Sequence, residues 1–73
     1  MINYKRKNYI LLAEEFYKND DKMKAIELYN KALSYPGEID SSLTILTNLA
    51  IIYEQLDLLD ESMDVYKKII ELD

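Results

Sequence analysis

Residues 9–16 read YILLAEEF, and the apolar members of this stretch recur at helical spacing. They stand at positions i, i+3, i+4 and i+7, which form one stripe along an α-helix. These members are Tyr9, Leu12, Ala13 and Phe16. Three later segments repeat the spacing, with the members Ala25, Leu28, Tyr29 and Ala32, then Leu46, Leu49, Ala50 and Tyr53, then Ser62, Val65, Tyr66 and Ile69. Because no segment alternates with the period of a strand, the sequence predicts four amphipathic helices and an all-α fold.

Polar residues and chain breakers separate the four segments. Residues 19–21, Asn-Asp-Asp, form a polar turn, and Asp21 is suited to cap the second helix. Pro36 and Gly37 end the second helix, since proline cannot continue a helix and glycine tolerates left-handed geometry. Candidate caps for the third and fourth helices are Asp40, Ser41, Ser42 and Asp60. We therefore predict helices over residues 4–18, 22–34, 41–55 and 60–72.

The two halves of the chain repeat each other at an offset of 37 residues. The equivalent pairs are Leu12 and Leu49, Ala13 and Ala50, Phe16 and Tyr53, Ala25 and Ser62, and Tyr29 and Tyr66. A fixed offset that holds across both helices of each half indicates an internal repeat. The sequence therefore predicts two helix-turn-helix units of the same design.

The repeated pattern resembles the tetratricopeptide repeat. Its members are, in order, a leucine followed by a small residue, an aromatic residue, a turn, and then small and aromatic residues again. The resemblance covers about residues 6–73 in two copies, of which the first matches more positions. It implies a single all-α domain over residues 1–73, in which two antiparallel helix-turn-helix repeats stack as a short right-handed alpha-solenoid. Repeat one then spans about residues 6–36 and repeat two about residues 41–73, with a loop at residues 35–40.

The chain departs from the family pattern mainly at its turns. Asp20 and Asp57 stand where the family has a glycine, and aspartate is among the residues that tolerate such turns. Ser62 replaces a small alanine, and Ile69 replaces a small residue. The offset of 37 residues exceeds the usual repeat of about 34. We place the additional residues in the loop near residues 36–40 or in an early extension of the third helix.

Composition excludes most forms of catalysis. The 73 residues contain neither cysteine nor histidine, which removes disulfides, the usual zinc ligands and the commonest general base. The serines have no lysine at Ser-x-x-Lys spacing, and one glycine cannot build a phosphate-binding loop. Asp57, Asp60 and Asp64 share a helix side and could attract a divalent cation, but solvated acidic residues are also usual at a helix start. We therefore expect no enzyme, no catalytic residue, no metal and no cofactor.

Charge is distributed unevenly along the chain. Residues 1–36 carry a net charge of +2 and residues 37–73 a net charge of −7. The acidic half argues against nucleic acid and anionic membranes as partners. We interpret the basic cluster at residues 5–7 as a solvated first helical turn. No stretch resembles a signal peptide or a membrane span, and the expected location is cytoplasmic.

The resemblance also implies where a partner binds. In this family the first helices of stacked repeats line a concave groove. The groove positions map to Lys7, Ile10, Glu14 and Tyr17 in the first copy, and to Thr44, Thr47, Asn48, Ile51 and Glu54 in the second. A solvated face without a ligand has a similar composition. Family members that clamp chaperone tails use lysine and asparagine where this chain has Ile10 and Glu14, so we do not expect that ligand.

The last helix presents an apolar stripe to the place that a further repeat occupies in a longer stack. Its members are Leu59, Met63, Tyr66 and Ile70. We expect the stripe to mediate self-association into a homo-oligomer, either a dimer or an exchange of helix pairs. Alternatively, the chain is a fragment of a longer repeat protein.

The function implied by the resemblance is a non-enzymatic protein–protein or peptide interaction module, acting as an adaptor or scaffold. The partner is then a protein or peptide. One alternative is a structural oligomerisation unit that binds only its own copies. Another is a part of a longer repeat protein that senses short peptides.

Overall fold

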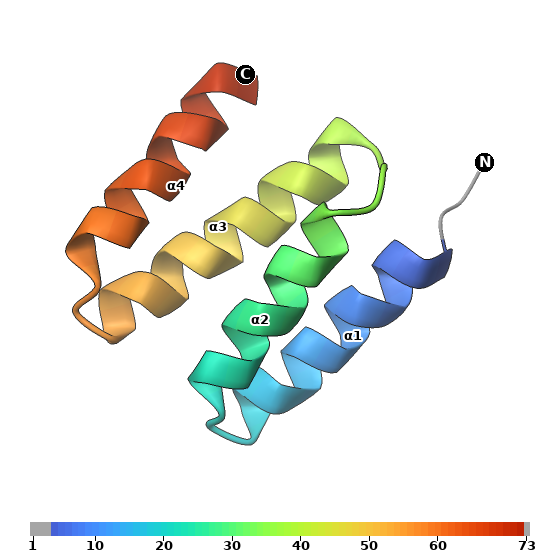
Figure 1. The fold of residues 1–73 in the computed structure, drawn as a ribbon, viewed down its shortest axis with the longest axis horizontal. Coiled ribbons are helices and arrows are strands. Elements are labelled where there is room, and N and C mark those ends of the chain that lie inside the picture. The colour runs from blue at the N-terminus through green and yellow to red at the C-terminus, as the bar shows by residue number, and fades with distance from the viewer. Residues whose placement is uncertain (1–3, 73) are drawn as a thin grey trace. The chain divides into compact units, whose positions relative to one another are not determined.

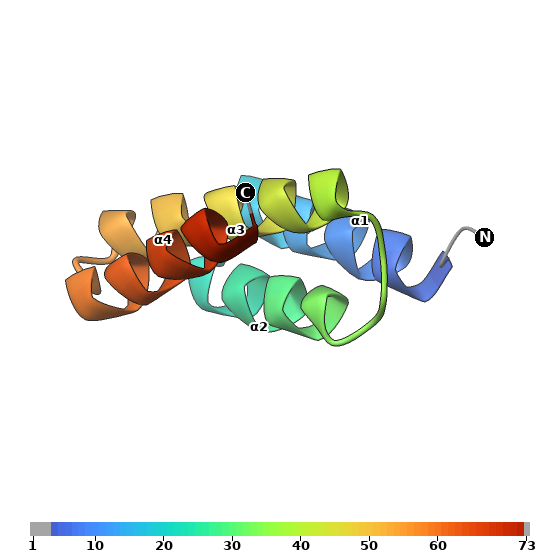
Figure 2. The same ribbon diagram turned by 90° about the horizontal axis from the view of Figure 1, so that it is seen from above.

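The computed structural model describes residues 4–72, and over this range the chain consists of α-helices and the turns that join them (Figure 1). The helices are α1 (Tyr4–Lys18), α2 (Lys22–Leu33), α3 (Ile39–Gln55) and α4 (Leu59–Leu72). They form two compact units, Met1–Gly37 and Glu38–Asp73. Each unit is one antiparallel hairpin, α1 with α2 and α3 with α4, as a second view also shows (Figure 2). The predicted all-α fold built from helical hairpins is confirmed.

The two turns within the hairpins share one hydrogen-bond pattern. The backbone donor and acceptor pairs are Asp20 with Tyr17 (3.0 Å) and Asp21 with Phe16 (2.9 Å) in the first turn, and Asp57 with Glu54 (3.1 Å) and Leu58 with Tyr53 (2.8 Å) in the second. This pattern is a Schellman motif, which requires one residue in the left-handed region. Asp20 and Asp57 take that conformation, with φ of 64° and 59°. The prediction that aspartate tolerates this turn in place of glycine is confirmed.

Helix starts agree with the predicted caps only in the first unit. The Asp21 side chain accepts a hydrogen bond from the backbone N–H of Lys24 at 3.1 Å, which confirms Asp21 as the N-cap of α2. The carbonyl of Glu38 accepts the N–H of Ser42 at 3.0 Å, so α3 already begins at Ile39. The prediction that residues 40–42 cap α3 was therefore wrong, since these residues lie inside the helix.

The start of α4 also precedes its predicted cap. The carbonyl of Leu58 accepts the N–H of Ser62 at 3.0 Å, and α4 begins at Leu59. Asp60 consequently lies in the first turn of the helix, where a carboxylate faces the positive end of the helix dipole. Asp60 supports α4 electrostatically and is not its cap.

Small residues allow α1 and α2 to approach each other closely. Ala13 on α1 and Ala25 and Ala32 on α2 are fully buried, and the buried ring of Tyr29 adds apolar bulk to the same core. Leu12, which belongs to the predicted stripe, is 48% exposed. It lies about 100° around the helix from Ala13 and therefore at the edge of the buried face.

The second unit has a broader buried stripe on α3. Its members are Ile45, Leu46, Leu49, Ala50 and Ile52. On α4, Ser62 and Val65 are buried. Ser62 occupies the position equivalent to Ala25, so this serine acts as a small packing residue, as the sequence predicts.

The end of the first unit packs on a buried arginine. Arg6 is only 4% exposed, so the interpretation of residues 5–7 as a solvated turn was wrong for this residue. Arg6 precedes Ala13 by two helical turns and so shares its buried face. A Cβ atom at Gly37 would lie 2.6 Å from Cδ and 2.7 Å from Cζ of Arg6. No glycine has a positive φ among the described residues, so Gly37 serves close packing and not the predicted left-handed geometry.

Candidate interaction surfaces

The groove residues predicted in the first copy lie on one side of α1. Lys7 and Glu14 are exposed, whereas Ile10 and Tyr17 are half-buried. Their spacing of three and four residues holds them on a single side of α1, where Ile10 and Tyr17, three and four residues from Ala13, border its buried face. The face combines a cation, a carboxylate, an aliphatic side chain and a phenol. It can therefore offer both apolar contact and hydrogen bonds.

The groove residues predicted in the second copy lie on the side of α3 opposite its buried stripe. Thr44, Thr47 and Ile51 are exposed, and Asn48 is half-buried. The hydroxyl of Thr44 donates to the carbonyl of Asp40 at 3.1 Å, within the same helix. Exposed Ile51 gives this face an apolar centre between polar side chains.

Glu54, the last residue of the second set, is bonded to α4. The hydroxyl of Tyr66 donates a hydrogen bond to Glu54 Oε1 at 2.7 Å. This bond favours the protonated phenol and raises the pKa of Tyr66. The sequence predicts that Glu54 and Tyr66 belong to separate surfaces, and the turn between α3 and α4 brings them together. In the first unit the equivalent positions hold Tyr17 and Tyr29, so this pairing of an acid with a phenol is particular to the second unit.

The apolar residues predicted for self-association form an exposed row along α4. These residues, which we call the α4 stripe, are Leu59, Met63, Tyr66 and Ile70, and they are between 43% and 73% exposed. Buried Ser62 and Val65 occupy the neighbouring side of the helix. Helix α4 therefore has one apolar side inside its unit and a second one exposed to solvent.

A second exposed apolar area lies on α1 and is absent from the sequence predictions. We call it the α1 patch; its residues are Tyr4, Leu11 and Leu12, which are between 48% and 69% exposed. The sequence signal for this patch is the adjacent pair Leu11 and Leu12. Neighbouring residues of a helix point in directions about 100° apart, so a narrow buried face cannot cover both leucines.

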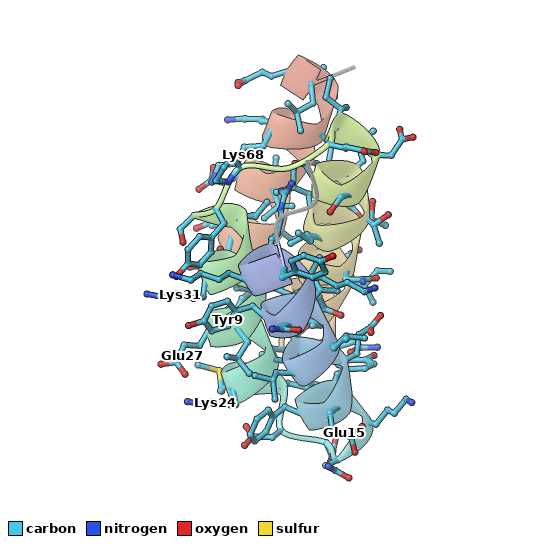
Figure 3. All side chains as sticks on the ribbon, turned by 90° about the vertical axis from the view of Figure 1, so that its right-hand side faces the viewer. Tyr9, Glu15, Lys24, Glu27, Lys31 and Lys68 are labelled. Carbon is cyan, nitrogen blue, oxygen red and sulfur yellow. The ribbon has the colours of Figure 1, made fainter. Side chains whose placement is uncertain are left out.

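The segment after α2 stacks on α1, which the sequence also does not indicate. The rings of Tyr9 and Tyr35 stack with centroids 5.7 Å apart and planes inclined by 13°. Lys5 Nζ lies 5.8 Å from the centre of the Tyr35 ring, within reach of a cation–π contact. Tyr9 is labelled in Figure 3, which looks onto α1. Because Tyr35 precedes Pro36, its position suggests a loop, and no periodic pattern predicts the stacking.

Exposed ion pairs account for two lysines of the first unit. Lys22 lies 2.7 Å from Asp20. Lys24 lies 2.6 Å from Glu27, and Figure 3 labels both residues of this second pair. The hydrogen bond from Lys22 lowers the pKa of Asp20, and the bond to Glu27 raises the pKa of Lys24. Exposed pairs of this kind contribute little to stability. They lie outside the predicted binding positions.

A metal-binding cluster and a membrane-spanning helix are both absent from the described residues 4–72. In this range no group of three or more acidic side chains lies together in a way that could hold a metal ion, and this includes Asp57, Asp60 and Asp64. None of the helices in the same range combines the length and the hydropathy needed to cross a membrane.

Comparison with known proteins finds a family match in the second half of the chain. Residues 43–73 match the family model described as Tetratricopeptide repeat. The first copy, which has more of the residues typical of the pattern, lies outside the matched range. Searches of curated proteins and of solved structures found no significant match. Repeats of this family are a non-catalytic fold that generally mediates protein–protein interactions.

Proposed function

We propose, from the match of residues 43–73 to the tetratricopeptide repeat, that the chain is a non-enzymatic protein–protein or peptide interaction module, an adaptor or scaffold. It contacts its partner through the exposed side chains of α1 and of α3. The family match is the observation that carries this proposal, because the repeat fold generally serves protein contacts.

The composition of the α3 face supports its use in binding. Ile51 offers an exposed apolar anchor, and Thr44 and Thr47 offer hydroxyl groups beside it. An apolar anchor within a polar rim is the usual anatomy of a protein interface. Neither threonine belongs to the buried stripe; the hydroxyl of Thr44 already donates within α3 and can still accept a hydrogen bond from a partner.

A selection of displayed peptides tests the proposal. Random peptides of about twelve residues, displayed on phage, are selected against the purified full chain, and binding of the selected peptides is measured by calorimetry. Ile51→Arg places a bulky charge on the proposed face, and we expect it to weaken binding at least about tenfold. Met23→Arg makes the same kind of change at an exposed position on α2 and serves as the control.

Two outcomes count against this site. If Ile51→Arg binds as tightly as the parent chain, the α3 face is not the binding surface. If Met23→Arg weakens binding equally, the effect of Ile51→Arg reflects charge or folding and not a contact. Circular dichroism of each variant establishes that the helices are intact.

A second function, self-association as a structural oligomerisation unit, is favoured by one observation. The α4 stripe exposes four large apolar side chains in a continuous row, and Ile70 is 73% exposed. Continuous exposed apolar surface commonly marks a protein interface.

A further inference from the structure

We propose that the α4 stripe of one molecule docks on the α1 patch of a second copy of this chain, so that copies associate head to tail. This inference rests on the second function above, self-association, and names the surface that receives α4.

The α4 stripe is suited to rigid docking. It extends from Leu59, the first residue of α4, to Ile70 near its end. Tyr66, within the stripe, is held by its 2.7 Å hydrogen bond to Glu54. A side chain that is already oriented loses less conformational freedom on binding. The stripe therefore presents a fixed aromatic ring between aliphatic neighbours.

The α1 patch contains a leucine whose equivalent in the second unit is buried. Leu12 is 48% exposed, whereas Leu49, the equivalent residue of the second unit, is 1% exposed. The same position of the repeat is therefore buried in the second unit and exposed in the first. Within residues 4–72 Leu12, Leu11 and Tyr4 stay uncovered, which makes this side of α1 a receptor for apolar side chains.

Charge favours docking of the α4 stripe on the α1 patch of a second copy over docking on that copy's α4 stripe. The unit that contains α1, residues 1–37, has a net charge of +2, and the unit that contains α4, residues 38–73, has a net charge of −7. A symmetric contact between two α4 stripes brings two acidic units together, whereas contact between α4 and α1 joins opposite signs.

The helices themselves repeat this contrast in charge. Their exposed charged residues are Lys5, Lys7, Glu14, Glu15 and Lys18 on α1, and Asp60, Glu61, Asp64, Lys67, Lys68 and Glu71 on α4. The net charge of these exposed residues is +1 on α1 and −2 on α4.

A head-to-tail contact leaves one α1 patch and one α4 stripe uncovered in every pair. Further copies can therefore add at both ends unless a ring closes. The average mass in solution should rise past that of a dimer as concentration increases. A symmetric contact, in contrast, stops at the dimer.

Complementation between two variants tests the proposal. Met63→Lys with Ile70→Lys disables the α4 stripe, and Leu11→Lys with Leu12→Lys disables the α1 patch. All of these residues are exposed, so the helices should form in both variants. In sedimentation equilibrium at several hundred micromolar we expect each variant alone to be a monomer of 8.6 kDa. Their equimolar mixture should form a heterodimer of twice that mass and nothing larger, because each variant retains the face that the other lacks.

Other results contradict the proposal at different points. Met23→Lys, an exposed change on α2, is the control and should associate like the parent chain. If the parent chain is a monomer at every concentration, both self-association and the inference are wrong. If the α1 variant still dimerises and only the α4 variant is monomeric, self-association is right and the α1 receptor is wrong. If the mixture stays monomeric, the head-to-tail contact is refuted. Leu11→Lys alone repeats the test should the double variant lose its helical circular dichroism.

Discussion

At the scale of single residues, the hairpin turns depend on two aspartates in the left-handed region. Asp20 and Asp57 have φ of 64° and 59°, where a side chain with a Cβ atom is strained. Asp20 also pairs with Lys22 at 2.7 Å, so its replacement has two effects. Asp57 has no ion pair among those described and isolates the backbone effect.

Asp57→Gly should stabilise the chain by about 0.5–1 kcal/mol. Glycine removes a left-handed penalty of about 1–2 kcal/mol and adds an entropic cost of about 0.5–1 kcal/mol. Urea unfolding followed by circular dichroism measures the difference. Asp60→Gly, inside α4, is the control and should destabilise by about 1 kcal/mol. A loss of stability in Asp57→Gly would show that the side chain has an unrecognised role.

Gly37→Ala should destabilise the chain by about 1 kcal/mol, the low end of the cost of overpacking, because the atoms it meets belong to the end of a long side chain. The added Cβ atom would overlap the far end of the Arg6 side chain, so this buried side chain must shift. In an Arg6→Ala background the same change should cost much less, because the overlapping atoms are gone. Equal costs in both backgrounds, measured by urea unfolding, would mean that Arg6 is not the cause.

At the scale of the helices, each hairpin is assembled from small residues at matched positions. Ala13 and Ala25 in the first unit, and Ala50 and Ser62 in the second, are all buried. Ala13→Leu should therefore cost about 1–3 kcal/mol through overpacking between α1 and α2. Leu12→Ala, one residue away and half exposed, should cost less than about 1 kcal/mol. An unchanged denaturation midpoint in Ala13→Leu would mean that a different face of α1 meets α2.

The bond between α3 and α4 should make stability depend on alkaline pH. The pKa of Tyr66 is raised above its usual 10.0 by the hydrogen bond to Glu54. A raised folded pKa means that the bond contributes stability below pH 10.0, and that this contribution is lost as pH rises through the folded pKa. Tyr66→Phe should thus be less stable than the parent near neutral pH, and the difference should shrink above pH 10.0.

Urea titrations of both proteins across this pH range measure the difference in unfolding free energy. Tyr4→Phe provides the comparison, because it removes an exposed phenol for which no bond is described. Its difference from the parent should not vary with pH in the same way. A constant difference for Tyr66→Phe would contradict the role of the bond.

At the scale of the whole molecule, the opposite charges of the two units should determine how the proposed head-to-tail association responds to salt. Raising NaCl from about 50 to about 300 mM shortens the screening length from about 14 to about 6 Å. A head-to-tail contact between unlike charges should then weaken, and the average mass at fixed concentration should fall. Sedimentation equilibrium at both salt levels measures it. A mass that rises with salt would instead point to two acidic units meeting, as in a symmetric α4 dimer.

The sequence by itself determined the features that depend on local spacing. Apolar periodicity set four helices, the offset of 37 residues set two equivalent hairpins, and the polar turns set the left-handed aspartates. These features follow from bonds and contacts within a few residues of each other along the chain, which a periodic pattern records directly. The same periodicity placed the α4 stripe on one exposed side of its helix.

Only the tertiary structure decided which side chains each helix covers and which it leaves open. Arg6 is buried although it belongs to a basic cluster, Leu12 is exposed although it belongs to the apolar stripe, and Tyr66 reaches Glu54 across the hairpin. Each of these outcomes depends on the distance and rotation between two packed helices. A helical pattern gives the direction of a side chain on its own helix, but not the position of the neighbouring helix that buries it or bonds to it.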